Sequence, residues 1–219
     1  HMWTPDIYQG APAPVGAFIA TVSKGGMFAL LLRYFAWTDF AEYSVLFVLL
    51  AFVAVASMVV GNLLALMQNN VKRLLGYSSI AHFGYLLVAL LAGGQNAGTA
   101  ACVYLTAYFV TMIAAFGIIS VLRKEEKEMA FLEDFQGLFW THPWLAGIFT
   151  AVMFSLAGIP LTGGFVGKFY VVTAGIGSAL WFLIIVLIAT SVVGLYYYLR
   201  VVVTMATDLK AKNDLTARP

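Results

Sequence analysis

The sequence predicts an all-α polytopic membrane protein with about six transmembrane helices, the fifth of them broken between Gly158 and Gly164. Hydrophobic residues make up 62% of the 219 residues and charged residues 10%, whereas a soluble domain carries about 25% charged residues. The mean hydropathy is +0.92. The apolar runs are too long and too evenly apolar for the strands of a membrane barrel. Helices are then favoured, because an unpaired backbone group in lipid costs several kcal/mol.

Six apolar segments follow one another, and each is long enough to cross a bilayer about 30 Å thick. They are Val15–Leu32, Val45–Met67, Leu74–Leu91, Thr99–Leu122, Trp144–Gly177 and Ala179–Ala206. Residues 15–206 are therefore expected to form the transmembrane bundle. Residues 1–14 are polar and rich in proline, which predicts a loop, and residues 207–219 are expected to be a tail or linker.

The first segment contains a lysine near its centre. Lys24 lies midway between Val15 and Arg33, so it cannot reach either membrane surface without distortion. Gly25 and Gly26 follow it and leave room for a neighbouring helix or water. Lys24 could be a structural residue paired with a carboxylate or with backbone carbonyls. A functional role is favoured, because ionisable groups at mid-membrane depth are usually functional.

The third segment contains His82, ten residues beyond Lys72 and therefore about 15 Å along the helix. A single membrane histidine can simply hydrogen-bond a neighbour. Its unperturbed pKa near 6.5 also allows it to accept and release protons at low cost. Together with the buried lysines, His82 becomes a candidate proton carrier.

The fifth segment is interrupted at its centre by Gly158, Pro160, Gly163 and Gly164, with Lys168 just beyond. A cation in hydrocarbon costs at least about 2.5–3.5 kcal/mol. A broken helix with an ammonium group beside the break is typical of ion sites in membrane proteins. Lys168 could stabilise the break by donating to freed carbonyls, or it could take up and release protons, and these two roles are compatible.

Basic residues in the connections predict the orientation of the bundle. Arg33 lies on one side of the bundle, whereas eight basic residues lie on the side where the first helix begins. This asymmetry predicts that the side with the eight basic residues is cytoplasmic. They are Lys72, Arg73, Arg123, Lys124, Lys127, Lys210, Lys212 and Arg218. The asymmetry would be lost if the fifth segment were re-entrant, so a single, broken crossing is expected. The mixed charges of residues 123–128 predict a solvated turn.

Other residues exclude some classes of site. Cys102 is the single cysteine, so no disulfide within the chain and no cysteine cluster for zinc or iron–sulfur is possible. The glycines lie in spans and form no phosphate-binding loop. No cofactor and no metal is expected in this chain. Several polar residues in the spans are expected to pack helices together or to order water between the ionisable groups. They are Thr21, Ser23, Asn62, Ser79, Thr106, Tyr108, Thr111, Ser155 and Thr162.

Three stretches match a known family. The first combines residues 1–6, which read His-Met-Trp-Thr-Pro-Asp, with residues 10–14 and 23–24, and the others are residues 70–85 and 158–170. Through them almost the whole chain resembles the antiporter-like membrane subunits of respiratory complex I, in particular the subunit N branch of bacterial NADH–quinone oxidoreductases. The resemblance places the chain at about the eighth to thirteenth helices of a fourteen-helix subunit. The glutamate and lysine of the family's fifth and seventh helices would then lie upstream.

The resemblance implies a function for each ionisable residue. Lys24 matches the buried lysine that links two half-channels, His82 a relay position, and Lys168 the terminal proton site on the broken helix. The implied function is proton translocation in a bacterial inner membrane, driven by quinone reduction elsewhere and without redox chemistry in this chain. The implied partners are the neighbouring membrane subunits of complex I. A subunit of a multisubunit cation/proton antiporter and a purely structural scaffold subunit remain as alternatives.

Overall fold

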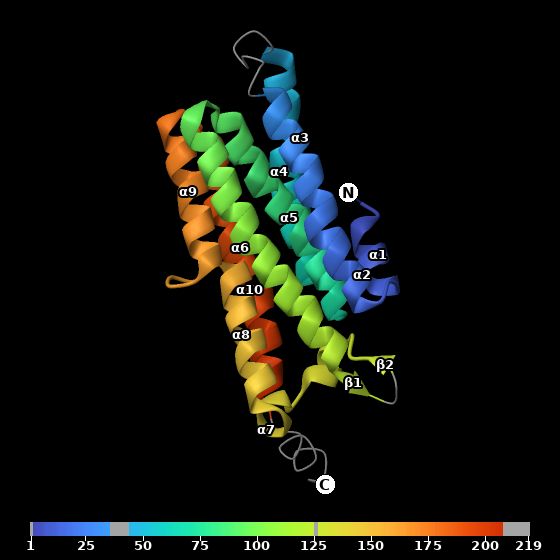
Figure 1. Ribbon diagram of the computed structural model, residues 1–219. Helices are drawn as coiled ribbons and strands as arrows, with labels where there is room; N and C mark the ends of the chain where they lie inside the picture. The colour runs from blue at the N-terminus through green and yellow to red at the C-terminus, as the bar shows by residue number, and fades with distance from the viewer. Residues whose placement is uncertain (1, 36–43, 125–126, 208–219) are drawn as a thin grey trace.

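The structure is a computed structural model that describes residues 2–35, 44–124 and 127–207, which form a bundle of long helices (Figure 1). Five of its helices are long and apolar enough to cross a membrane. One is the continuous helix Ala13–Phe35, made of α2 (Ala13–Phe18), a π-helical turn (Ile19–Ser23) and α3 (Lys24–Phe35). The others are α4 (Ser44–Leu66), α5 (Val71–Ala92), α6 (Gly94–Val121) and α10 (Trp181–Ala206). These helices confirm the predicted fold class.

The remaining crossing is broken, as the sequence predicts. It consists of α8 (Pro143–Ala157) and α9 (Gly163–Gly177), and Figure 1 shows α9 continuing beyond the end of α8 in the same general direction. The interruption therefore lies within one crossing, and the segment does not turn back. Gly158 ends α8 in the left-handed conformation, with φ +81°. Pro160 lies in the gap, whereas Gly163 and Gly164 already belong to the first turn of α9.

The prediction of a loop over residues 1–14 is wrong, because α1 (Thr4–Gly10) occupies most of that stretch and α2 already begins at Ala13. Pro5 lies in the first turn of α1, where a missing backbone N–H removes no helical hydrogen bond. The helix packs against the beginning of α5. Most of the predicted tail, with Lys210, Lys212 and Arg218, lies outside the described residues, and the orientation of the bundle stays a prediction.

The connection between α6 and α8 contains a small hairpin where a solvated turn was predicted. Its strands, β1 (Arg123–Lys124) and β2 (Lys127–Glu128), pair antiparallel. A 3₁₀ turn (Leu132–Phe135) and the short helix α7 (Leu138–Thr141) follow. Glu128 accepts hydrogen bonds from Lys72 Nζ at 2.8 Å and from the backbone N–H of Ala13 at 2.9 Å. The hairpin is therefore attached to the starts of both α5 and α2.

Helix α5 is surrounded by other elements, and nearly all of its residues are buried. Two glycines allow α4 to approach it closely. A Cβ on Gly61 would lie 2.8 Å from the backbone nitrogen of Ala81, and one on Gly84 would lie 2.8 Å from the carbonyl oxygen of Ala54. Small residues commonly serve this purpose where helices pack in membranes. As a result, most polar side chains of α5, including Ser79, His82 and Tyr85, lie in the interior of the bundle.

Candidate functional site

Three polar residues on α5 organise the buried polar groups. Ser79, His82 and Tyr85 follow one another at intervals of three residues, so they lie along one broad face of the helix. All three are at most 5% exposed, and they lie near the middle of Val71–Ala92. Lys24 contacts the first of them and Lys168 the last. This face of α5 is the candidate site.

Lys24 is half-buried and donates to α5 at Ser79. Its ammonium group lies 3.1 Å from the carbonyl oxygen of Ser79 and also donates to the Ser79 hydroxyl. The lysine directly follows the π-helical turn. Gly25 brings α6 close to this point, because a Cβ there would lie 2.5 Å from the ring of Phe109. The sequence predicted room for a neighbouring helix at Gly25, and Phe109 of α6 occupies it.

The hydroxyl of Ser79 has two further partners. Tyr108 of α6 donates to it at 2.8 Å, and the hydroxyl of Tyr8 lies 3.3 Å away. Tyr8 is fully buried and comes from α1, the helix that the sequence reasoning missed. Four elements of the bundle therefore meet at one serine.

His82 is held between tyrosines. Its Nδ1 lies 2.5 Å from the hydroxyl of Tyr104, and its Nε2 lies 3.2 Å from the hydroxyl of Tyr198. The rings of Tyr85 and Tyr108 pack beside it, with centroids 5.5 Å and 5.2 Å from the imidazole. A neutral imidazole has one donor and one acceptor nitrogen, so one hydroxyl donates to the ring and the other accepts from it. Each ring nitrogen of His82 is therefore hydrogen-bonded to a tyrosine hydroxyl.

Lys168 is 8% exposed, and its ammonium group has three acceptors. These are the carbonyl oxygens of Leu156 at 3.1 Å and Ala157 at 2.7 Å, and the hydroxyl of Ser191 at 2.7 Å. An ammonium group has three donor hydrogens, so all of them are used. The two carbonyls belong to the last turn of α8, where helix carbonyls lack partners and the helix dipole favours a cation. Lys168 thus donates to carbonyls at the break, which is one of the two roles that the sequence left open.

The glycine at the break makes this arrangement possible. Besides having positive φ, Gly158 lies against the lysine, because a Cβ there would be 2.8 Å from Lys168 Cδ and 2.9 Å from Nζ. Thr162 caps α9 by accepting a hydrogen bond from the backbone N–H of Phe165 at 3.3 Å. Within the break, Gly158 thus leaves space for the Lys168 side chain, and Thr162 caps the start of α9.

Tyr85 lies between the histidine and the second lysine. Its ring centroid is 5.4 Å from Lys168 Nζ and 5.5 Å from the imidazole centroid of His82. Its hydroxyl accepts a hydrogen bond from Asn62 at 3.1 Å and lies 3.5 Å from the hydroxyl of Thr190. Both the cation and the imidazole therefore contact an aromatic ring whose position is fixed by α4 and α10.

Two hollows adjoin these groups. A cavity of about 10 Å³ lies beside His82, between α6, α8 and the start of α9, and is the size that one water needs. Its polar lining consists of His82, Tyr104, Tyr108, Thr111 and Ser155. A groove of about 320 Å³ leads from Lys168 and Ser191 along the break between α8, α9 and α10. Both hollows are next to candidate residues.

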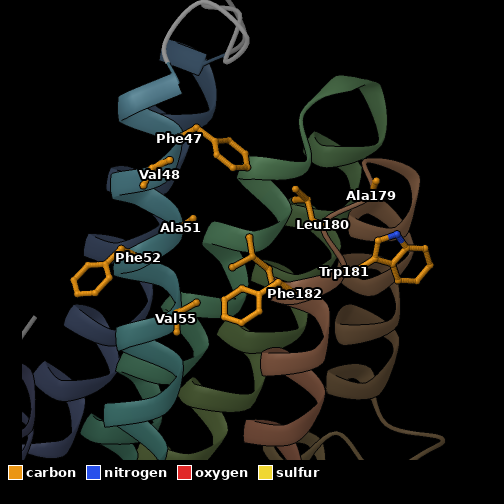
Figure 2. Close-up of a pocket in the computed structure, with 10 residues that line it drawn as sticks. Phe47, Val48, Ala51, Phe52, Val55, Ala179, Leu180, Trp181 and Phe182 are labelled. Atoms are coloured by element: carbon orange, nitrogen blue, oxygen red, sulfur yellow. The ribbon is translucent and has the colours of Figure 1, made fainter.

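A larger groove, of about 530 Å³, lies elsewhere. Figure 2 shows it between α4 and the start of α10, with Phe47, Phe52 and Phe182 among its lining residues. The lining side chains are apolar apart from the indole nitrogen of Trp181. A binding site normally combines an apolar wall with convergent polar groups, so this groove is a weaker candidate than the polar face of α5.

The structure brings together most, but not all, of the polar residues that the sequence singled out. Thr111 and Ser155 share a hydrogen bond at 3.1 Å beside His82, and Asn62 bonds Tyr85. In contrast, Thr106 is exposed and bonds a carbonyl of its own helix. The sequence reasoning missed Tyr8, Tyr85, Tyr104, Tyr198 and Ser191. Tyr104 and Tyr108, which are four residues apart and so share a face of α6, were the one available signal for the tyrosines around His82.

A known protein family matches most of this chain. Residues 1–194 match the protein family described as NADH:quinone oxidoreductase/Mrp antiporter, TM. A NADH-quinone oxidoreductase subunit N from Ectopseudomonas mendocina (strain ymp) is 52% identical over 207 residues, which are 94% of this chain and 42% of that protein.

Solved structures are also similar to this chain. A chain of respiratory complex I from Thermus thermophilus has a TM-score of 0.80 at 38% identity, covering 94% of this chain and 44% of that chain. A chain of the Mrp complex from Dietzia sp. DQ12-45-1b has a TM-score of 0.85 at 24% identity, covering 95% and 39%, which shows a shared fold. The chain spans less than half the length of each of these proteins.

Proposed function

The chain belongs to the NADH:quinone oxidoreductase/Mrp antiporter transmembrane family, and we propose that it forms a proton-translocating part of a bacterial NADH–quinone oxidoreductase subunit N. Protons move between Lys24, His82 and Lys168 across the interior of the bundle. This role needs no electron transfer in this chain.

The observation that carries the proposal is the polar face of α5. Ser79, His82 and Tyr85 are spaced by three residues, so consecutive members are about 4.5 Å apart along the helix axis. The contacts of Lys24 and Lys168 with α5 are thus separated by about 9 Å of rise, with the imidazole between them. Ionisable groups at such depth are costly and are usually retained for transport. Their alignment along one face of the buried helix α5 supports a relay better than three independent structural roles.

Electrostatic coupling supplies the driving step. Two ammonium groups that feel one another load and unload protons as a pair. A proton arriving at Lys24 disfavours the charged form of Lys168, which then releases its proton toward the groove at the break. Quinone reduction elsewhere in the complex changes the field at the first lysine and so drives the transfer.

The proposed setting follows from the family and from the charge pattern. The protein is a multi-pass membrane protein, and we place it in a bacterial inner membrane with its basic connections in the cytoplasm. Its proposed partners are the neighbouring membrane subunits of complex I. The high identity to a subunit N favours this assignment over others.

The test is Lys168→Ala in the full-length subunit, assembled into the complex and reconstituted in vesicles. We expect proton pumping per electron to fall, while assembly is retained. Arg33→Ala is the matched control, because Arg33 is an exposed cation in the last turn of α3, away from the site. Unchanged pumping per electron in the Lys168 variant would refute the assignment.

A cation/proton antiporter subunit is the second candidate, favoured by the fold shared with the Mrp complex. It predicts sodium-dependent transport that does not depend on electron flow from NADH.

A structural scaffold subunit is the third candidate. It predicts that removal of Lys24 or Lys168 lowers assembly and leaves turnover per assembled complex unchanged.

A further inference from the structure

We propose that Ser79 is a proton-carrying residue of the relay, passing protons from Lys24 to Tyr108 through its hydroxyl. This inference rests on the proposed function and assigns its first internal step. It also gives a role to a serine that the sequence alone indicated only as a possible helix contact or water ligand.

The number of hydrogen bonds at Ser79 supports the proposal. A serine hydroxyl has one hydrogen to donate and two lone pairs that accept. Lys24 and Tyr108 both donate to Oγ, so both lone pairs are used when the lysine is charged. The one hydroxyl hydrogen then points to Tyr8, whose oxygen lies 3.3 Å away. Every donor and acceptor of the buried hydroxyl is thus used in that state.

Loss of the lysine proton must change this pattern. A neutral amine accepts a hydrogen bond, so the Ser79 hydrogen can turn toward Lys24, and the Tyr8 hydroxyl then donates to Ser79. The serine can turn because each of its neighbours at Oγ is a hydroxyl or an amine, and these groups both donate and accept. The local network therefore has two satisfied arrangements that differ in the charge of Lys24.

The transfer step balances. Lys24 Nζ gives one proton to Ser79 Oγ, Ser79 gives its own proton to the Tyr108 oxygen, and Tyr108 gives its hydrogen to a water in the cavity beside His82. That water gives a proton to Tyr104, and Tyr104 gives its own proton to His82 Nδ1. Before the transfer, the Ser79 hydrogen turns from Tyr8 to Tyr108, and Tyr108 turns its hydrogen from Ser79 to the cavity. Each hydroxyl and the water gain one proton and lose one, so the positive charge moves from Lys24 to His82. Tyr104 lines the same cavity and reaches His82 Nδ1 at 2.5 Å.

The helix geometry matches this route. Ser79 and His82 are one turn apart on α5, and Tyr108 and Tyr104 are about one turn apart on α6. Ser79 bonds Tyr108, and His82 bonds Tyr104, so the two helices are joined by two successive polar contacts. The cavity of about 10 Å³ lies against the second contact and has room for a single water.

The test uses Ser79→Ala and Ser79→Thr in the full-length subunit within the assembled, reconstituted complex. The alanine variant should lower proton pumping by roughly tenfold or more, because positioned proton-transfer groups usually contribute at least that much. Threonine restores a hydroxyl at the same position and should recover most of the loss. Thr150→Val is the control, because it removes a hydroxyl that bonds only a carbonyl of its own helix, α8.

Tyr108→Phe is a second variant, which tests the route by itself if Ser79→Ala does not assemble and otherwise also tests the serial order. Tyr108→Phe keeps the ring beside His82 and removes the hydroxyl, and it should lower pumping as well. The double variant Ser79→Ala, Tyr108→Phe should pump no worse than the poorer single variant, because both residues act on one path. Losses that multiply would overturn the proposal.

Failure of this inference can be separated from failure of the proposed function by including Lys24→Ala. If Lys24→Ala loses pumping while Ser79→Ala and Tyr108→Phe pump like the control, Ser79 is not a carrier and the function stands. If Lys24→Ala also pumps normally, both are overturned.

Discussion

Two adjacent glycines at the start of α9 should respond differently to alanine. A Cβ on Gly164 would lie 1.7 Å from the carbonyl oxygen of Ser155 and 2.7 Å from its carbonyl carbon. The nearest neighbour of a Cβ on Gly163 is the Cβ of Ala107, at 3.6 Å. The first contact is impossible without moving backbone, and the second is an ordinary van der Waals contact.

The expected cost of Gly164→Ala follows from these contacts. Overpacking against a well-packed site typically costs about 1–3 kcal/mol. Moving the backbone also breaks the hydrogen bond from Gly164 N–H to Ser155 Oγ, now 3.1 Å long, which contributes about 1 kcal/mol. The sum is about 2–4 kcal/mol, or roughly 30- to 1,000-fold in the equilibrium constant for unfolding. Gly163→Ala should be neutral or slightly stabilising, because alanine is the better helix former by up to about 1 kcal/mol.

Both variants are made in the full-length subunit. The readouts are the amount of assembled complex in membranes and the temperature at which the purified complex releases the subunit. Gly164→Ala should lower both, and Gly163→Ala should match the unmodified protein. Equal loss in both variants, or normal behaviour of Gly164→Ala, would refute the reasoning about the contact between α8 and α9.

Two further predictions concern the break and the hairpin. Gly158→Ala should reduce proton pumping per electron, because the added Cβ displaces the Lys168 side chain. The left-handed conformation also costs alanine about 1–2 kcal/mol. Pumping equal to that of the unmodified complex would contradict this prediction. Glu128→Gln should lower the thermal stability of the complex, because Lys72 is 4% exposed and would lose its half-buried carboxylate partner. Removing one member of a fully buried pair costs about 3–5 kcal/mol, so a smaller loss is expected for this partly exposed pair. The double variant with Lys72→Met should recover part of the loss, and no recovery would count against the ion pair.

The spans and the break were predictable because both depend on local properties of the sequence. Apolar length sets where a helix can cross, and the segments 45–67 and 179–206 differ little from α4 and α10. Pro160 lacks a backbone N–H, and Gly158 adopts positive φ at no steric cost, so a helix has physical reasons to end at Gly158. The balance of basic residues gave the further expectation of a single crossing.

Other local features were not predicted, because tertiary contacts decide them. Residues 1–14 contain three prolines and a glycine, which favour a loop, yet α1 forms there against α5. A Cβ on Gly76 would lie 2.6 Å from Cα of Pro5, so the helix fits only because α5 has no side chain at that point. The π-helical turn before Lys24 has no strong sequence signal either, although such turns are frequent at functional sites.

The same contrast applies to the candidate site. Some of its residues can be recognised from their own position in the sequence, whereas others can be recognised only from a tertiary contact. Lysines in apolar segments are conspicuous because each costs at least about 2.5–3.5 kcal/mol to insert, so Lys24 and Lys168 could be found directly. A serine or tyrosine in a span costs far less and is common, so Ser79 and Ser191 carry no comparable signal. Which hydroxyl meets which lysine depends on how α6 and α10 are rotated against α5, and that rotation is set by packing along their whole length. The cations of the site were therefore predictable from the sequence, whereas the hydroxyl groups proposed to move protons between them could be assigned only from the structure.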